Sequence, residues 1–312
     1  MRAFVIIATK GRAKETRVLL DFLQRQTLPP AYALIVGSEA GDIDGCGDHP
    51  LLAAGRGEAF VSPRVGSTCQ RNAGLEALKR RGAFGQSGGD CFCAFFDDDF
   101  RPAADWLENA AARFEKGGIV GLTGLVLADG VTTGGLTEEQ AAAFLSGKTP
   151  PAARYANMNT ERETECAYGC NMAFIGTVAR DIRFDENLPL YGWQEDRDYT
   201  GQCLKLNLGR AVFVPSCVGV HRGVSSGRTS GLRLGYSQIA NPLYLMKKGT
   251  MTLKSGLLHM ARNAVANVVK SVAPPRPNVD YKGRLIGNLR AIGDVLRAIS
   301  NPRRILDADF QA

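Results

Sequence analysis

The chain has 312 residues, of which 45% are hydrophobic and 22% are charged. These are the proportions of a globular protein with room for one large domain and an appendage, and they exclude a disordered or fibrous chain. No apolar run approaches the roughly 20 residues of a membrane-spanning helix. The first apolar run, residues 3–9, is also too short for a signal peptide.

The net charge of +7 is distributed unevenly. Residues 240–312 hold 12 Lys and Arg against 4 Asp and Glu, a charge of +8, whereas the rest of the chain holds 26 against 27. The excess positive charge therefore belongs to the C-terminal segment alone. We expect no nucleic-acid partner for the protein as a whole.

Eight cysteines occur at positions 46, 69, 91, 93, 166, 170, 203 and 217. They form neither a CxxC pair nor the spacing of a disulfide framework, so reduced thiols in a cytoplasmic protein are the simplest account. A zinc site at Cys166 and Cys170 would lack a second pair of ligands, because the chain has only three histidines. We therefore do not expect zinc.

Short apolar runs alternate with helical periodicity from the N-terminus onward. Residues 4–8 and 32–36 predict strands, and residues 13–26 predict a helix between them. The Gly- and Asp-rich residues 37–66 predict a long loop with a short strand near 59–61. A helix is expected at 67–81.

After a connector at 82–90 comes CFCAFF, residues 91–96, an unbroken apolar run that predicts a strand buried on both faces. We expect a helix at 105–116, a strand at 119–127, and a loop-rich region at 129–165 with a helix at 138–145. Strands at 170–175 and 211–214, with a helix at 199–208 between them, complete the pattern. This alternation predicts an α/β fold with a sheet covered by helices.

The C-terminal segment differs in kind. Its apolar residues recur at helical spacing while basic residues fall on other faces, as shown by Leu285, Leu289, Ile292, Leu296 and Ile299. This predicts a basic amphipathic helix after a proline-rich break at 274–277, and a similar helix before it around 257–268. We divide the chain into a domain at 1–240 and a basic helical extension at 241–312.

Three adjacent acids, Asp97, Asp98 and Asp99, stand at the carboxyl end of the predicted buried strand, where open α/β sheets bind ligands. Such carboxylates repel one another unless a cation shares them, and hard divalent ions favour oxygen ligands. A metal there could hold a diphosphate and neutralise the charge that builds as it leaves. The alternative is a solvated acidic turn.

Residues 192–198, Gly-Trp-Gln-Glu-Asp-Arg-Asp, place acids beside an indole at a predicted loop-to-helix junction. This suits a general base next to a surface on which a sugar stacks. It is equally typical of an acidic helix N-terminus with a packed Trp193. His221 closely follows a predicted strand and could complete the coordination of a cation, although a lone histidine is more often structural.

Six features occur in a fixed order along residues 4–221. They are Thr9 with Arg12 after the first strand, QRNAG at 70–74, FFDDDF at 95–100, GCNMAF at 169–174, FDENLPLYGWQEDRDY at 184–199 and VPSCVGVH at 214–221. In this order the sequence resembles the inverting glycosyltransferase family 2, which has the GT-A fold. The resemblance implies a Rossmann-like, mixed and mostly parallel sheet flanked by helices, with residues 1–240 as the catalytic domain.

The resemblance also implies roles for single residues. The positions that match the family's nucleotide-sugar pocket are Thr9, Arg12, Arg71, Asn72, Asp97 and Asp98. The positions that match its ligands of Mn²⁺ or Mg²⁺ are Asp97, Asp99 and His221. The catalytic base matches Asp196, with Glu195 beside it, and acceptor-side positions match Trp193 and Asn171.

One position departs from the family pattern. Members commonly place an aspartate after the second strand to read a uracil ring, whereas this sequence has Gly37-Ser38-Glu39 there. Either Ser38 or Glu39 takes that role, or the base is not uracil.

We therefore expect a metal-dependent, inverting enzyme that moves a sugar from a nucleotide-diphosphate sugar to a glycan or lipid-linked acceptor, in bacterial-type polysaccharide, glycolipid or glycan synthesis. One alternative is a sugar-nucleotide nucleotidyltransferase, which the single glycine in residues 8–12 disfavours. The other is a non-catalytic carbohydrate-binding protein, which has no need of both acidic clusters.

For residues 250–304 the sequence leaves two interpretations open. The basic amphipathic helices rest on an anionic membrane, which makes the protein peripheral on the inner face of the plasma membrane. Alternatively, they cap the catalytic domain or form the contact of a homo-oligomer.

Overall fold

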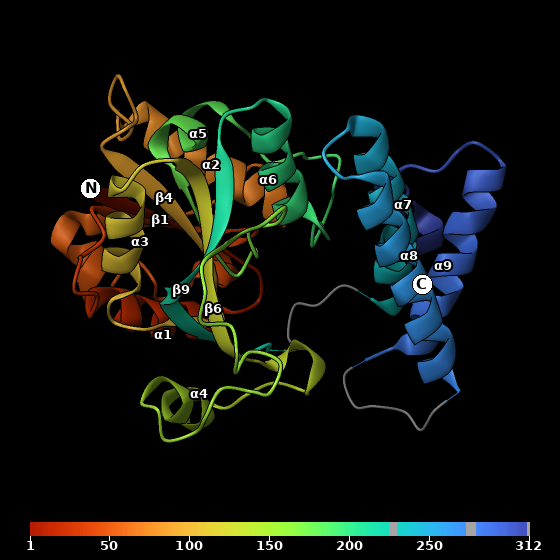
Figure 1. Cartoon of the computed structure of the whole chain (residues 1–312), viewed down its shortest axis with the longest axis horizontal. Helices are drawn as coiled ribbons and strands as arrows, with labels where there is room; N and C mark the ends of the chain where they lie inside the picture. The colour runs from red at the N-terminus through yellow and green to blue at the C-terminus, as the bar shows by residue number, and fades with distance from the viewer. Residues whose placement is uncertain (225–229, 273–278, 311–312) are drawn as a thin grey trace.

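The computed structural model describes residues 1–224, 230–272 and 279–310. One mixed sheet carries helices on both faces, and three helices from the C-terminal part of the chain pack beside it (Figure 1). The predicted proline-rich break at 274–277 lies outside these ranges.

The sheet runs in the order β3-β2-β1-β4-β8-β6-β9-β5, and β7 pairs with β9. Its first four strands are parallel to one another. Strand β8 is antiparallel to β4 and β6, and β9 is parallel to β6 and antiparallel to β5 and β7. The predicted α/β fold with a mixed sheet is confirmed. The strands are β1 (Arg2–Thr9), β2 (Tyr32–Gly37), β3 (Gly57–Val61), β4 (Cys91–Asp97), β5 (Phe100–Pro102), β6 (Ile119–Asp129), β7 (Arg162–Glu163), β8 (Asn171–Ile175) and β9 (Arg210–His221).

Two hydrophobic cores cover the two faces of the sheet, and β4 contributes to both. Phe92, Ala94 and Phe96 face the core under α1 (Ala13–Gln24) and α3 (Trp106–Glu115). The alternate residues of β4 face the core under α2 (Ser67–Arg80), α5 (Gly176–Asp181) and α6 (Glu195–Lys205). Residues 91–96 are all buried, as the sequence predicted, so the strand delivers Asp97 to the carboxyl edge of a rigid sheet.

Gln70 on α2 joins the carboxyl ends of two central strands. Its buried Nε2 donates to the carbonyl oxygens of Thr9 and Val36, each at 2.7 Å. Gly74, one turn later, lets α2 approach β1, because a Cβ there would lie 2.8 Å from Cγ2 of Ile6. The QRNAG segment therefore fixes the loops after β1 and β2, which border the candidate site.

Two predicted elements have different bounds in the structure. The helix expected at 199–208 begins at Glu195 and ends at Lys205, and it lies between two residues in the left-handed backbone region, Gln194 and Asn207. The strand expected at 211–214 extends to His221, because it also pairs with β5. The helix predicted at 138–145 is confirmed as α4 (Glu138–Leu145). Shorter helical turns are η1 (Ala40–Ile43), η2 (Leu52–Arg56), η3 (Gly130–Thr132), η4 (Pro302–Leu306) and η5 (Ala308–Phe310).

The C-terminal helices are α7 (Gly231–Lys248), α8 (Leu253–Ser271) and α9 (Tyr281–Leu296). The sequence did not predict α7, since Gly235 and Pro242 within it are helix breakers. Residue 240 lies inside this helix, and we propose a boundary before Gly231 instead. Within the described ranges, no helix is both long enough and apolar enough to cross a bilayer.

A buried charged network holds these helices against α6. Lys248 Nζ donates to Asp185 and to Asp198, each at 2.7 Å, and the Thr250 hydroxyl donates to Asp198 at 2.6 Å. The Asp198 side chain is fully buried. Asn241 Nδ2 also donates to the carbonyl oxygen of Trp193 at 2.8 Å. The start of α6 is therefore fixed from outside the sheet.

Candidate active site

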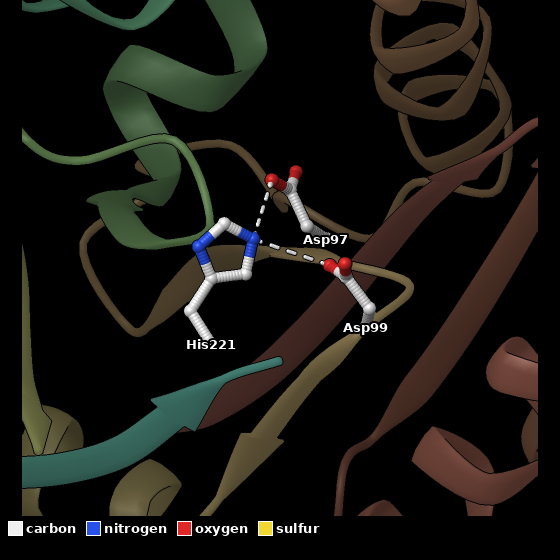
Figure 2. A group of neighbouring side chains, drawn as sticks. All are labelled: Asp97, Asp99 and His221. Carbon is white, nitrogen blue, oxygen red and sulfur yellow. Dashed lines mark ion pairs between the residues drawn. The ribbon is translucent and has the colours of Figure 1, made fainter. Parts of the chain in front are cut away.

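The acidic triplet and the end of β9 meet at the carboxyl edge of the sheet. Asp97 ends β4, Asp98 and Asp99 form the turn into β5, and β5 pairs Phe100 with His221. His221 Nε2 lies 3.2 Å from Asp99 Oδ1 and 3.9 Å from Asp97 Oδ2. Figure 2 shows the imidazole ring facing both carboxylates.

The other side of His221 is held by two groups that the sequence did not reveal. Its Nδ1 lies 3.2 Å from Asp129 Oδ1 and 3.4 Å from the Tyr168 hydroxyl, which itself donates to Asp129 at 3.0 Å. A carboxylate behind Nδ1 is the usual support of a metal-binding histidine, since it directs Nε2 toward the ion. Asp129 ends β6 as Asp97 ends β4, and this shared position was a usable sequence signal.

These residues fit a divalent cation. Two carboxylate oxygens, from Asp97 and Asp99, and one nitrogen of His221 all lie within 4.8 Å of one another. Carboxylates are ligands of Mg²⁺ and Mn²⁺, and an imidazole suits ions of the transition series. Within the part of the chain that the structure describes, this is the cluster of ligand-type side chains arranged to hold a metal.

Asp98 turns away from that cluster toward the first loop of the chain. Its Oδ1 accepts from Arg12 Nη1 at 2.9 Å, and Arg12 Nη2 donates to the carbonyl oxygen of Val224 at 2.8 Å. Burial raises the pKa of Asp98 to about 7, an effect that Arg12 reduces and neighbouring Asp99 increases. Arg12 therefore lies directly beside the triplet.

Arg71 connects the triplet with the second acidic cluster. Its Nη2 donates to Asp97 at 2.9 Å and to the carbonyl oxygen of Gly169 at 3.1 Å, and its Nη1 pairs with Glu195. The amide of Gly169 in turn donates to Asp196 Oδ2 at 3.0 Å. The two acidic clusters are therefore neighbours joined by one buried guanidinium.

The acids at the start of α6 have raised pKa values. Burial raises the pKa of Glu195 well above its ordinary range, although Arg71 opposes this. Burial likewise raises the pKa of Asp196, although the amides of Gly169 and Arg197 donate to it. A carboxylate whose pKa is raised holds a proton more strongly, which is the property required of a general base.

A cavity of about 750 Å³ opens over the triplet. Thr9, Arg12, Arg71, the three aspartates and His221 line one side, together with Tyr191. The opposite wall comes from the first turns of α7 and α9 and includes Arg233, Asp280 and Arg284. This second wall could not be predicted from the sequence, because the C-terminal segment has no motif that points to the sheet.

Several predicted site residues do not line this cavity. Asn72 uses its amide to bond the backbone of Phe184 and the side chain of Glu186. Asn171 accepts from the Thr123 hydroxyl in the interior of the sheet. The set of predicted residues outside the lining is Ser38, Glu39, Asn72, Asn171, Trp193, Glu195 and Asp196.

The loop after β2 is organised by a buried acid that the sequence did not single out. Asp42 accepts from the amides of Gly11, Ser38 and Glu39 at 2.6, 2.7 and 3.0 Å. It thereby ties this loop to the loop after β1. The Ser38 hydroxyl is buried and has no hydrogen-bond partner among the described residues.

The chain matches no protein-family model, and no curated protein matches it. Solved structures do share its fold. Mannosyltransferase PcManGT from Pyrobaculum calidifontis, in complex with GDP-Man and Mn²⁺, aligns with 99% of this chain and 82% of its own at 15% identity and a TM-score of 0.54. S. aureus TarS 1-349 in complex with UDP-GlcNAc aligns with 96% of this chain and 82% of its own at 15% identity and a TM-score of 0.57.

A third structure, GalNAc-T7 with UDP, GalNAc and Mn²⁺, aligns with 96% of this chain and 58% of its own, at 14% identity and a TM-score of 0.56. The chain has a GT-A-type fold. The fold that the sequence resemblance implied is thereby confirmed, down to the helices that follow the sheet.

Proposed function

We propose that this GT-A-type protein is a metal-dependent inverting glycosyltransferase of the family 2 type. The observation that carries the proposal is the joining of the Asp97, Asp99 and His221 cluster to the Glu195 and Asp196 pair through Arg71. It is supported by the GDP-Man and UDP-GlcNAc that two structures of this fold contain.

In the proposed reaction, the acceptor hydroxyl oxygen bonds to the anomeric carbon while the bond from that carbon to the diphosphate oxygen breaks on the opposite face. Asp196 takes the proton of the hydroxyl, and the nucleoside diphosphate leaves with the electron pair. A divalent cation, Mn²⁺ or Mg²⁺, held by Asp97, Asp99 and His221 would supply charge neutralisation to the departing diphosphate.

The protein groups around the reaction have separable tasks. Thr9, Arg12 and Asp98 border the donor side of the cavity, and the Ser38 hydroxyl or Glu39 is our candidate for reading the base. Arg71 is already paired with two carboxylates, so it orients Asp97 and Glu195. We propose that the acceptor hydroxyl meets Asp196 beside Tyr191, with Trp193 and Asn171 supporting that side.

The proposed partners are a nucleotide-diphosphate sugar, a glycan or lipid-linked acceptor, and an anionic membrane contacted by residues 250–304. We also propose a cytoplasmic location at the inner face of the membrane. A homo-oligomer remains the competing use of the C-terminal surface.

A thermal-shift screen of the purified chain tests the donor site. UDP-, GDP-, dTDP- and CMP-sugars are added with and without Mn²⁺, since a ligand that binds only the folded state raises the midpoint. We expect a metal-dependent shift with one nucleotide that is lost in Asp99→Ala. No shift with any donor would favour a non-catalytic carbohydrate-binding protein, and release of pyrophosphate from a nucleoside triphosphate would favour a nucleotidyltransferase.

A further inference from the structure

Large apolar side chains are exposed in one part of the molecule. Of the 19 exposed large hydrophobic residues in the described ranges, 14 lie between Leu253 and Leu306. Leu257 and Val265 on α8 are 51% and 63% exposed, and Val272, directly after this helix, is 86% exposed. Leu289 and Leu296 on α9 are 61% and 84% exposed. Patches of this kind mark interaction sites on soluble proteins.

These residues follow helical spacing, so each helix has one apolar face toward solvent. On α8 the positions 257, 261, 265 and 268 form one stripe, and on α9 the positions 286, 289 and 296 form another. Figure 1 shows both helices, in blue, packed with α7 beside the catalytic part of the chain. We call these two stripes the α8–α9 surface.

Buried polar side chains lie in the contact between α7, α8 and α9. Asn267 Nδ2, on α8, donates to Gln238 of α7 at 2.7 Å and to Asn288 of α9 at 2.8 Å. All three side chains are buried. Gly287 allows α9 to approach α7 closely, since a Cβ there would lie 2.2 Å from the carbonyl oxygen of Leu232.

Helices in lipid pack in this way, through small residues and interhelical amide hydrogen bonds. An apolar cluster around Tyr236 and Ala291 also stabilises the contact between α7 and α9. The buried positions of α8, however, include only Gly256 and Asn267, while six leucines and valines of this helix are exposed to solvent: Leu253, Leu257, Leu258, Val265, Val268 and Val269. Water alone would favour the opposite arrangement.

The charges around the α8–α9 surface identify its partner. On α8, Lys254 and Arg262 are exposed, and the helix contains no Asp or Glu. On α9, Lys282 and Arg290 are exposed, and the one acid, Asp294, is buried against Tyr236 and Arg304. A second copy of the chain would place like charges opposite one another, whereas anionic lipid headgroups complement them.

Helix α9, which carries part of this surface, also borders the second wall of the cavity. Its first turn contributes Arg284, the two residues before the helix contribute Val279 and Asp280, and the neighbouring α7 contributes Arg233. A bilayer bound by α8 and α9 would therefore lie beside helices that reach the candidate site. An acceptor anchored in that bilayer would have a short path to the cavity.

We propose that the α8–α9 surface docks in the interface of an anionic membrane and presents the cavity to an acceptor anchored in the lipid. The docking stands on the surface itself, and only the identity of the acceptor rests on the function proposed above. The apolar stripes enter the headgroup region, and the basic side chains beside them contact anionic lipids.

Co-sedimentation of the full chain with vesicles tests the docking. Vesicles of phosphatidylcholine alone are compared with vesicles that also contain phosphatidylglycerol, at low and high salt. We expect binding to the anionic vesicles that weakens with salt, because screened charges attract less.

The first variant replaces four residues of the surface: Leu257→Ser, Val265→Ser, Leu289→Ser and Leu296→Ser. Its matched control carries Leu206→Ser and Leu208→Ser, two residues of the catalytic part that are 56% and 44% exposed. We expect the first variant to lose at least about tenfold in vesicle affinity, since its apolar contacts are removed, and the control to bind normally.

A second variant, Lys254→Glu, Arg262→Glu and Lys282→Glu, keeps the apolar side chains and reverses three exposed charges. It should lose binding to the anionic vesicles. This variant still tests the proposal if the serine variant misfolds. Unchanged sedimentation of folded variants would overturn the proposal. So would light scattering that shows a dimer of the natural chain which the serine changes dissociate, because the surface would then bind a second copy.

The donor-dependent thermal shift separates this proposal from the proposed function. We expect both surface variants to keep the shift with nucleotide sugar and metal, because they leave the cavity lining unchanged. Loss of vesicle binding with a retained shift supports membrane docking. Vesicle binding without any donor shift would leave docking in place and remove the glycosyltransferase assignment.

Discussion

His221 is both a candidate metal ligand and a side chain with a shifted pKa. Burial alone would lower its pKa, but Asp99 and Asp129 outweigh burial and raise the pKa well above the ordinary value. The imidazole of the metal-free chain therefore holds its proton more strongly than a free imidazole does. A cation needs the Nε2 lone pair, so metal and proton compete for this residue.

Metal uptake should accordingly release protons, and lowering the pH should weaken metal affinity. Titration calorimetry with Mn²⁺ in two buffers of different ionisation enthalpy measures the number released. We expect His221→Ala to release about one proton fewer than the natural chain and to bind Mn²⁺ more weakly. Equal proton release by both proteins would show that His221 is not a ligand.

Asp196 carries the proposed proton transfer, and its replacement should separate chemistry from binding. We expect Asp196→Asn to lower the transfer rate by a factor of about 10² to 10⁴, because the amide cannot take the proton. The donor-induced thermal shift should stay, since the side chain does not line the cavity.

The neighbouring acids serve as internal controls for that experiment. Glu195 pairs with Arg71, and Asp198 bonds Lys248 and Thr250, so their loss should lower stability. Near-normal transfer by Asp196→Asn would move the base to Glu195.

At the scale of elements, α7 links the second wall of the cavity to the start of α6. Its first turn lines the cavity, and its last residue, Lys248, bonds Asp198 near the start of α6. The position of Glu195 and Asp196 therefore depends on a helix outside the sheet. This dependence makes Lys248 a positioning residue.

Lys248→Met should lower the free energy of unfolding by about 3 kcal/mol, because it leaves the buried Asp198 carboxylate without its cation. Chemical denaturation measures the loss. Lys247→Met changes the adjacent, exposed lysine and should have little effect. If both variants unfold alike, the network does not anchor α6.

The sequence was most informative where chemistry and strand pattern coincide. The run CFCAFF followed by three aspartates predicted both β4 and the acidic edge, because burial on both faces leaves an apolar signature of its own. Arg71, Glu195 and Asp196 belong to motifs that the sequence shows, but the pairing of the Arg71 guanidinium with Glu195 is a contact between distant segments of the chain. No local pattern encodes such a contact.

The C-terminal part was predictable only in outline. The spacing of apolar residues predicts its two amphipathic helices. It does not predict α7, because Gly235 and Pro242 within that helix are helix breakers. The bond between Lys248 and Asp198 spans 50 residues, and neither side chain belongs to a motif that names the other. The second wall of the cavity was missed for the same reason.

For the molecule as a whole, the acidic site makes stability depend on pH. Asp98, whose pKa burial raises to about 7, and His221, whose pKa is raised by Asp99 and Asp129, both hold protons more tightly in the folded chain than in the unfolded chain. A group whose pKa is higher in the folded chain stabilises the fold at pH values below its unfolded pKa. This contribution is lost as the pH rises through the pKa of the folded chain.

The melting temperature of the metal-free chain should therefore fall as the pH rises from about 5 to about 8. Over this range the free energy of unfolding should decrease by at least about 1 kcal/mol. Mn²⁺ should restore more stability at the upper end of this range than at the lower end. Calorimetry across the range measures both effects, and Asp98→Asn should flatten the slope. A melting temperature that rises steadily with pH would contradict the assignment of these protons.

The position of β9 has a consequence for how the protein is made. The amide of Val224 donates to Asp99, which lies 125 residues earlier, and His221 joins the same acidic turn. Translation proceeds at about 5–20 residues per second, so roughly ten seconds separate the emergence of the aspartates from that of their partners. A chain released before β9 would hold the first parallel strands and their aspartates, but no histidine to close the cation site.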